Sequence, residues 1–168
     1  MITILLDTIK TPMGDMILLA RDGVMLLLEF ADAEGRVERE LRVRFPEHEL
    51  IKTENPSGFS ERIRAYYRGE MKAIEGIPTD GGGTEFQRRV WAELIRIPCG
   101  TTMSYGELAK QLGDKNAMRA VGLANGRNPI SIVVPCHRVI GADGSLTGYG
   151  GGVRRKEWLL RHEGALLI

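Results

Sequence analysis

A glycine-rich segment at residues 78–83 (PTDGGG) divides the chain into two halves that differ in pattern. This composition is typical of a linker, because proline and successive glycines oppose both helix and strand. We therefore expect an N-terminal domain at residues 1–78, a linker at 79–83 and a C-terminal domain at 84–168. A chain of 168 residues can supply two small domains, each with its own core.

Short apolar runs near the start of the chain predict a sheet. The runs at residues 2–9, 14–21 and 24–30 are separated by turn residues, and Asp22-Gly23 between two of them is typical of a β-hairpin. We expect an antiparallel three-stranded sheet, to which residues 49–53 would add an edge strand. Apolar spacing predicts helices at residues 34–45 and 57–68. This half shows no catalytic pattern.

The C-terminal half is predicted to be mainly helical. Thr84 with Gln87, and Ser104 with Glu107, have the spacing of capping boxes, which mark helix starts. The first helix would end near residue 95 and the second near 112–114. A third helix, at residues 116–125, would end at Gly126. Two short helices joined by a turn that contains glycine are typical of a helix-turn-helix. A last helix is expected at residues 153–163.

The predicted helix at residues 116–125 (NAMRAVGLAN) has small side chains, and Arg119 is its one charged residue. Reading base edges in the major groove requires side chains that reach them, and this helix has few. Small residues suit close approach to a minor groove, with one long side chain that probes the duplex. They suit tight helix packing equally well, so the composition of this helix leaves both functions open.

Charge differs between the two halves of the chain. Residues 84–168 carry 12 Lys and Arg against 7 Asp and Glu, a net +5, whereas residues 1–83 carry 11 against 15, a net −4. This asymmetry is a mild indication that the C-terminal half faces a polyanion. A random distribution of solvated charges would also produce it.

The segment at residues 132–140 (IVVPCHRVI) holds the strongest candidate for chemistry. Its β-branched run predicts a short buried strand or core segment that stops at Pro135, which places Cys136 at a turn on the rim of the core. His137 and Arg138 follow, and a cationic, partly desolvated site favours the thiolate that a nucleophilic cysteine requires. A buried structural cysteine beside a surface histidine fits these nine residues equally well.

The longer context resembles a known family. PCHRVIG, preceded by GLANGRNPI and followed by GSLTGYGGG and KEWLLRHEG, is similar to the methylated-DNA–protein-cysteine alkyltransferases, and among these to the constitutive bacterial type. The resemblance is densest at residues 84–164. It implies an α+β fold, with a ribonuclease H-like N-terminal scaffold domain of sheet and helices. The C-terminal domain would be winged-helix-like, with a helix-turn-helix, and would bind DNA and accept the alkyl group.

The resemblance implies direct repair of DNA in a single turnover. Cys136 would take the alkyl group irreversibly from O6-alkylguanine, and from O4-alkylthymine, in a nucleotide flipped through the minor groove. A relay from Cys136 through water to His137 and Glu163 would remove the thiol proton, and Tyr105 would donate a proton to guanine N3. No cofactor is implied. We expect a cytoplasmic monomer, with cooperative binding to double-stranded DNA left open.

The resemblance also assigns contacts to DNA and to the flipped base. Arg119 would enter the base stack, and Asn128 would brace the joint between its helix and the cysteine segment. The backbone of Val139, and that of Cys136, would accept from the exocyclic amine of the base. Further positions in the pocket or along the DNA are Ser104, Ala120, Gly122, Tyr149, Gly150 and Lys156. Other members have Ser at the position of Gly150 and Pro at that of Ser131, which bears on the width of the pocket.

Other classes of function make different demands. A DNA-binding module without chemistry would share the helix-turn-helix, and members of the family that lack the cysteine only bind lesions, but Cys136 is present. A cysteine hydrolase would need an oxyanion hole and a nucleophile signature, neither of which is visible. The spacing of Cys99, Cys136, His137 and His162 fits no zinc pattern. No apolar run approaches ~18 residues, the length of a membrane span, and two cysteines without an export signal predict a reducing compartment.

Overall fold

The computed structural model describes residues 1–33 and 35–166. The chain forms two compact units, Met1–Gly82 and Gly83–Ile168. Residue 34, at which we expected the first helix to begin, lies outside the described residues, as do residues 167–168. In the described part of the chain, no helix has the length and apolar character that crossing a membrane requires.

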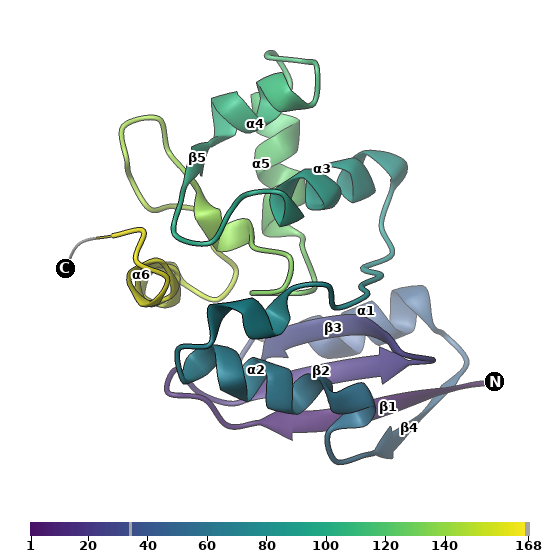
Figure 1. Ribbon diagram of the computed structural model, residues 1–168. Coiled ribbons are helices and arrows are strands. Elements are labelled where there is room, and N and C mark those ends of the chain that lie inside the picture. The colour runs from purple at the N-terminus through teal and green to yellow at the C-terminus, as the bar shows by residue number, and fades with distance from the viewer. Residues whose placement is uncertain (34, 167–168) are drawn as a thin grey trace. The chain divides into compact units, whose positions relative to one another are not determined.

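The sheet of the N-terminal unit has one strand more than the predicted meander. Strands β1 (Ile2–Ile9), β2 (Met16–Arg21) and β3 (Val24–Phe30) pair antiparallel as expected. Strand β4 (His48–Lys52) lies beside β1 in parallel, so the order is β3-β2-β1-β4 (Figure 1). The antiparallel pairing of the first three strands and the added edge strand were predicted correctly, but the parallel pairing of that edge strand with β1, which makes the sheet mixed, was not predicted. A parallel partner needs a crossover connection, and the helix between β3 and β4 supplies it.

Helices α1 (Arg36–Arg44) and α2 (Phe59–Tyr67) lie on opposite faces of this sheet (Figure 1). Helix α1 buries Leu41 against Ile4, Leu19 and Leu26. Short 3-10 helices flank α2, η1 (Pro56–Gly58) before it and η2 (Met71–Ile74) after it. Because both faces are covered, β3 is buried from its second residue to its last.

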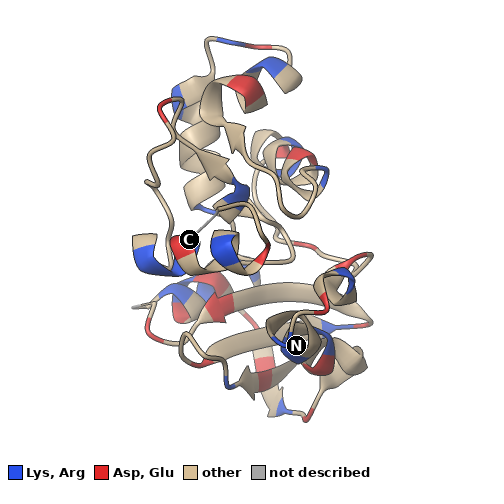
Figure 2. Ribbon diagram, turned by 60° about the vertical axis from the view of Figure 1, so that its left-hand side comes forward, with Lys and Arg blue, Asp and Glu red and all other residues tan. Residues whose placement is uncertain are grey.

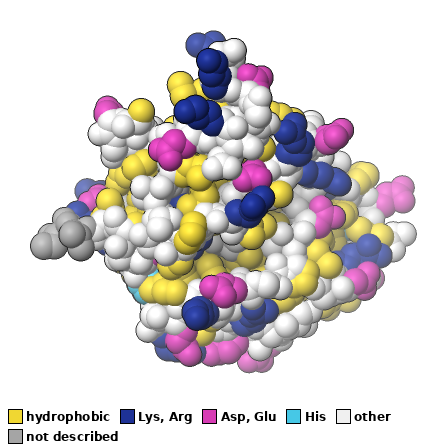
Figure 3. Space-filling model, turned by 45° about the horizontal axis from the view of Figure 1, so that its top comes forward, with side chains coloured by type: hydrophobic (Ala, Val, Ile, Leu, Met, Phe, Trp, Pro, Cys, Tyr) yellow, Lys and Arg dark blue, Asp and Glu magenta, His cyan; other side chains and the backbone are white. Residues whose placement is uncertain are grey.

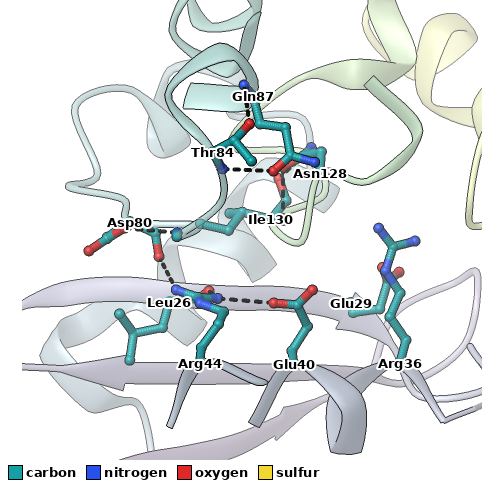
Figure 4. A network of polar contacts seen from close by, with 11 residues as sticks. Leu26, Glu29, Arg36, Glu40, Arg44, Asp80, Thr84, Gln87, Asn128 and Ile130 are labelled. Carbon is teal, nitrogen blue, oxygen red and sulfur yellow. Dashed lines mark hydrogen bonds and ion pairs between the residues drawn. The ribbon is translucent and has the colours of Figure 1, made fainter. Parts of the chain in front are cut away.

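Part of the predicted linker is bound to the N-terminal unit. Met25 exchanges backbone hydrogen bonds with the segment, donating to the Pro78 carbonyl and accepting from the Asp80 N–H, both at 2.9 Å. Arg44 donates to the carbonyls of Leu26 and Asp80, at 2.8 and 2.6 Å (Figure 4). Residues 78–80 thus follow β3.

The C-terminal unit begins with helix α3 (Glu85–Ile95). Its predicted capping box is confirmed, because the Thr84 N–H donates to Gln87 Oε1 at 2.9 Å and the Gln87 N–H donates to Thr84 Oγ1 at 3.1 Å (Figure 4). Helix α4 (Tyr105–Gln111) follows Ser104, whose Oγ accepts from the Glu107 N–H at 3.1 Å. Helix α5 (Met118–Gly126) begins two residues later than predicted.

Of the two forms predicted for the segment before Cys136, a short strand or a buried core segment, the structure has the buried core segment. Residues 131–134 form turns, and Ile132 has a positive φ of 73°. The amide of Asn128 explains why the segment is not a strand. It donates to the carbonyls of Ile130 and Val134, at 3.1 and 2.8 Å, and accepts from the Ile130 N–H at 3.0 Å (Figure 4). These bonds draw the segment into a turn and leave no extended backbone to pair.

Three short elements and a helix complete this unit. The 3-10 helix η3 (Cys136–Arg138) leads into strand β6 (Val139–Ile140), which pairs in parallel with β5 (Met103–Ser104). A glycine-rich loop at residues 141–152 then leads to helix α6 (Val153–His162). Strand β6 therefore fixes the end of the cysteine segment beside the start of α4.

Candidate active site

Cys136 lies at a buried turn, as the sequence predicted. It is the first residue of η3 and is 6% exposed. Its backbone N–H donates to the Val134 carbonyl at 2.8 Å, and its carbonyl accepts from Asn125 Nδ2 at 3.3 Å. The backbone on both sides of the thiol is therefore fixed by hydrogen bonds.

His137 and Glu163 form a buried hydrogen-bonded pair. The distance from His137 Nε2 to Glu163 Oε2 is 2.9 Å, and both side chains are fully buried. The other ring nitrogen, Nδ1, is buried and makes no hydrogen bond to the described protein atoms. Burial lowers the pKa of His137 below its ordinary value and outweighs the raising effect of Glu163. A neutral imidazole held in this way can accept a proton.

Arg138 shares the Glu163 carboxylate with His137. Arg138 Nε lies 2.9 Å from Glu163 Oε1, Nη2 lies 3.0 Å from Oε2, and Nη1 donates to the Ile97 carbonyl at 2.7 Å. Burial opposes ionisation of Glu163, but the hydrogen bonds from His137 and Arg138 prevail and lower its pKa to about 2. Glu163 is therefore a carboxylate at neutral pH, with its charge shared between two partners.

Sequence reasoning counted Arg138 only as a cation near the cysteine and did not predict its contact with Glu163. One signal for it was available, because Arg138 stands between His137 and Val139 in a segment predicted to be buried. A buried guanidinium requires a buried counter-charge. Glu163, already expected beside His137, was the candidate for that role.

Tyr105 and Lys156 converge on the glycine-rich loop. The Tyr105 hydroxyl donates to the Thr147 carbonyl at 3.2 Å. Lys156 Nζ donates to the same carbonyl at 2.8 Å and to the Val139 carbonyl at 2.5 Å. A Cβ added at Gly148 would lie 3.1 Å from the Tyr105 hydroxyl, so the loop passes directly over the phenol.

The charge states of Tyr105 and Lys156 reflect burial and the nearby cysteine. Burial lowers the pKa of Lys156 to about 8, and the charge of Cys136 opposes this shift. Burial also raises the pKa of Tyr105, and the charge of Cys136 adds to that rise. Lys156 is fully buried. Its ammonium group is bound by the carbonyls of Val139 and Thr147 in the interior. A lysine that contacts DNA would instead lie at the surface.

The remaining predicted residues divide between the surface of α5 and the interior. Arg119 and Ala120 are exposed on α5. Gly122 is half-buried, and a Cβ added there would lie 3.9 Å from the Tyr105 ring. Ser104 caps α4, and Asn128 and Ser131 are buried behind the cysteine. In the loop, Tyr149 is buried and Gly150 is exposed.

A pocket of about 480 Å³ opens between α4, α5 and the loop. The residues that line it are Tyr105, Gly106, Met118, Arg119, Gly122, Gly141 and Ala142. Met118 and Leu123 of α5 are 51% and 62% exposed. On the face drawn in Figure 3, apolar side chains lie between basic ones. Basic residues are spread along the C-terminal unit and form no single block (Figure 2).

Metal ligands are not gathered in this site. In residues 1–33 and 35–166, no group of three or more His, Cys, Asp or Glu side chains is placed to hold a metal ion. Cys99 is partly exposed, whereas Cys136 is buried.

The chain is similar to known proteins along its whole length. Residues 85–165 match the model of the 6-O-methylguanine DNA methyltransferase, DNA binding domain. The methylated-DNA–protein-cysteine methyltransferase of Shigella flexneri is 49% identical, with 100% of both chains covered. That of Mycolicibacterium paratuberculosis is 49% identical over 93% of this chain and 90% of the relative.

Solved structures show the same fold. The crystal structure of Mycobacterium tuberculosis O6-methylguanine methyltransferase has a TM-score of 0.82 and 42% identity, over 96% of this chain and 93% of that chain. A structure of Mycobacterium tuberculosis OGT in complex with DNA has a TM-score of 0.81 over the same shares.

A buried cysteine that directly precedes a buried His–Glu pair, in a unit that matches a DNA-binding domain, is the arrangement of a protein that acts on DNA. The identity over the full length makes the assignment specific. The chain belongs to the methylated-DNA–protein-cysteine methyltransferase family.

Proposed function

We propose that this protein repairs alkylated DNA by transferring the alkyl group of O6-alkylguanine to Cys136. The observation that carries the proposal is the buried Cys136 next to the His137–Glu163 pair, in the unit that matches a DNA-binding domain. Relatives of similar length are named methylated-DNA–protein-cysteine methyltransferases. O4-alkylthymine is the second substrate, since it carries the same kind of alkyl–oxygen bond.

The proton of the Cys136 thiol passes through a water molecule to His137 Nδ1. This nitrogen makes no hydrogen bond to the part of the protein that the structure describes, while Nε2 is held by Glu163. The imidazolium that forms is stabilised by the Glu163 carboxylate. Arg138 keeps that carboxylate ionised and in place. The sulfur, now a thiolate, is the attacking group.

Transfer is a displacement at a saturated carbon. A bond forms between Cys136 Sγ and the alkyl carbon, the bond from that carbon to guanine O6 breaks, and its electron pair stays with the base. Tyr105 then supplies a proton to guanine N3. Because no tetrahedral oxyanion forms, no oxyanion hole is required. The product is a stable thioether, so each chain acts once.

The loop and strand β6 form the walls of the base pocket. The Val139 carbonyl has a second lone pair beside the one that Lys156 occupies, and it accepts from the exocyclic amine of the flipped base. Tyr149 and Gly150 cover the base, and Lys156 ties this loop to β6 through Thr147. Lys156 thus stabilises the wall of the pocket, because it binds the loop and β6 to each other from the interior.

Helix α5 enters the minor groove. Its exposed residues Arg119 and Ala120, together with Gly122 and the Ser104 end of α4, face the duplex. Arg119 lines the pocket beside Tyr105, which supports its insertion into the stack in place of the flipped nucleotide. Asn128 links α5 to the cysteine turn.

The two units divide this work. Residues 84–168 form a winged-helix-like domain that binds DNA and accepts the alkyl group, with α4 and α5 as its helix-turn-helix. Residues 1–78 form a ribonuclease H-like scaffold, joined by residues 79–83. Support comes from the position of Cys136, Tyr105 and Arg119, which all lie in the second unit.

Titration with DNA tests the function. Increasing amounts of a duplex that contains O6-methylguanine are incubated with a fixed amount of protein, and the repaired base is counted. We expect repair to stop at one base per chain. Continued turnover would indicate a hydrolase, and binding without repair would indicate a DNA-binding module.

A further inference from the structure

Two buried asparagines near the end of α5 differ in how completely they are hydrogen-bonded. Both ends of the Asn128 amide are bonded, to Ile130 and Val134. Asn125 is 2% exposed, and its Nδ2 donates to the Cys136 carbonyl at 3.3 Å. Its Oδ1 is buried and accepts no hydrogen bond from the residues that the structure describes. A buried amide that serves only the fold normally has partners at both ends. The oxygen of Asn125 is therefore an acceptor for a donor from outside the chain.

The bond to Cys136 fixes which end of the Asn125 amide is the oxygen. A carbonyl oxygen accepts hydrogen bonds and donates none, so the end of the amide at the Cys136 carbonyl must be its N–H end. The nitrogen and the oxygen of an amide are about 2 Å apart, which places Asn125 Oδ1 within about 6 Å of the Cys136 carbonyl oxygen. The two N–H groups of an amine connect acceptors that are about 5 Å apart. One amine can therefore meet Asn125 Oδ1 and the cysteine turn together.

The position of Asn125 on α5 places its amide next to the pocket. Gly122 lies three residues earlier, on the same face of the helix. Gly122 lines the pocket together with Tyr105, and a Cβ added at Gly122 would lie 3.9 Å from the Tyr105 ring. Asn125 is one helical turn further along this face, where it reaches the Cys136 carbonyl. The amide thus lies one turn from the contact with Tyr105 and directly beside the cysteine turn.

We propose that Asn125 is a specificity-determining residue, whose Oδ1 accepts a hydrogen bond from the exocyclic amine of the flipped guanine. The amine is attached to C2 of guanine, which is bonded to N3, and Tyr105 is the proposed donor to N3. A base with N3 at the phenol therefore carries its amine beside the phenol, on the side of Asn125. The Val139 carbonyl accepts one hydrogen of the amine, and Asn125 Oδ1 accepts the other. The inference rests on the proposed function.

The energetics of the unbonded oxygen make this contact selective. A buried acceptor without a donor costs free energy. A guanine that supplies the donor removes this cost when it enters the pocket, and a base without the amine leaves it in place. A site built to bond a polar group of its substrate rejects an analogue that lacks the group for the same reason.

The same contact separates the two proposed lesions. O4-alkylthymine has a carbonyl oxygen on C2, where guanine has the amine, so it presents an acceptor to Asn125 Oδ1. Turning the amide over would offer N–H to the thymine, but it would bring Oδ1 against the Cys136 carbonyl, which also only accepts. Asn125 therefore favours O6-alkylguanine over O4-alkylthymine when the base enters the pocket.

Removing the acceptor from the protein and the donor from the base tests the inference. Three duplexes differ only in the lesion, which is O6-methylguanine, O6-methylhypoxanthine without the amine, or O4-methylthymine. The second-order rate of transfer is measured for the wild type, for Asn125→Leu, which has no acceptor, and for Asn125→Asp, which keeps an acceptor oxygen in either charge state.

We expect the wild type to prefer O6-methylguanine to O6-methylhypoxanthine. Asn125→Leu should reduce this preference roughly tenfold, the effect of one hydrogen bond, and Asn125→Asp should retain it. The rate on O4-methylthymine relative to O6-methylguanine should rise in Asn125→Leu. Asn125→Met removes the same acceptor with a longer side chain and takes the place of Asn125→Leu if that variant does not fold.

The outcomes separate this inference from the function on which it rests. If the wild type takes no methyl group from O6-methylguanine, the proposed function fails and the inference falls with it. If the wild type is active but Asn125→Leu slows transfer from O6-methylguanine and O6-methylhypoxanthine by the same factor, Asn125 supports the fold alone and only the inference is overturned. Loss of the preference in Asn125→Asp as well would overturn it too, because the N–H end would then be the part that acts.

Discussion

His137 Nε2 and Glu163 Oε2 lie 2.9 Å apart, in a place where both side chains are fully removed from solvent. A buried carboxylate requires hydrogen bonds from the histidine and from a further donor, because an unpaired charge in the interior is costly. Arg138 is the further partner, with two contacts to the same carboxylate. The pair therefore holds His137 in place, and burial lowers the pKa of that ring.

Replacing Glu163 by Gln should therefore impair transfer more than DNA binding. The amide cannot stabilise the imidazolium, and loss of general base assistance costs about 10²–10⁴ in rate. Single-turnover rates and binding to a methylated duplex are measured on the same preparations. Equal loss of rate and affinity would mean that Glu163 supports the fold and not the proton transfer.

The lowered pKa of the Glu163 carboxyl predicts how the stability of the protein depends on pH. The pKa of Glu163 falls from 4.5 to about 2 on folding, so its contribution to stability is complete above pH 4.5 and is lost as the pH falls toward 2. A shift of this size corresponds to roughly 3 kcal/mol. Urea unfolding between pH 5 and about 2 should show this loss in the wild type and a smaller one in Glu163→Gln. Parallel curves would contradict the assignment.

The acid limb of the rate profile should lie below the ordinary range of histidine. Burial lowers the pKa of His137 from 6.5, so the ring remains a neutral proton acceptor when the pH falls through that value. Single-turnover transfer should therefore hold its rate between pH 7 and about 6.5 and decline only at lower pH. A midpoint above pH 6.5 would show that His137 is protonated in the resting protein.

Arg119 should matter for duplex DNA and little for the chemistry. It is exposed on α5 and lines the pocket. Arg119→Ala is expected to reduce transfer from a methylated duplex strongly, because the gap left by a flipped nucleotide is no longer filled, and to spare transfer from the free base O6-benzylguanine. Arg39→Ala, an exposed arginine of the N-terminal unit, serves as control. Equal loss with both substrates would place Arg119 in the chemical step.

Alkylation of Cys136 should destabilise the protein. Cys136 is 6% exposed, and its backbone is held by Asn125 and Val134, so an added group meets close packing. Overpacking costs about 1–3 kcal/mol, a sizeable part of the ~5–15 kcal/mol that stabilises a domain. Asn128 connects this turn to α5 and passes the strain to the helix that carries Arg119. Melting temperature should fall from free to methylated to benzylated protein, and DNA affinity with it. Equal melting temperatures would refute the coupling.

Local signals in the sequence predicted local structure well. The capping box of Thr84 and Gln87 and the stop of α5 at Gly126 involve residues within one helical turn, so each could be read from its neighbours. The parallel strand β4 could not, because its place beside β1 depends on contacts more than forty residues apart. The turn at Ile132 was missed for a similar reason. β-branched residues favour a strand, and the Asn128 side chain overrides that preference.

In the site, the sequence identified the candidate residues and the structure supplied their contacts. Cys136 and His137 were candidates from their own segment and Glu163 from the resemblance, and the structure places His137 and Glu163 at hydrogen-bonding distance. The hydrogen bonds of Lys156 and Asn125 were not predictable. The acceptors are the backbone carbonyls of Thr147, Val139 and Cys136. Every residue has such a carbonyl, so the amino-acid sequence does not show which ones lie within reach.

The central claim is that Cys136 receives the alkyl group, and the mass of its peptide tests this directly. Wild-type protein, Cys136→Ser and Cys99→Ser are incubated with duplex DNA that contains O6-methylguanine. Each protein is then digested with a protease, and the masses of its peptides are measured by mass spectrometry. We predict one added methyl group on the peptide with Cys136 in the wild type and in Cys99→Ser. Cys136→Ser should gain none and still bind the methylated duplex. A methyl group on Cys99, or on the Cys136→Ser variant, would contradict the account.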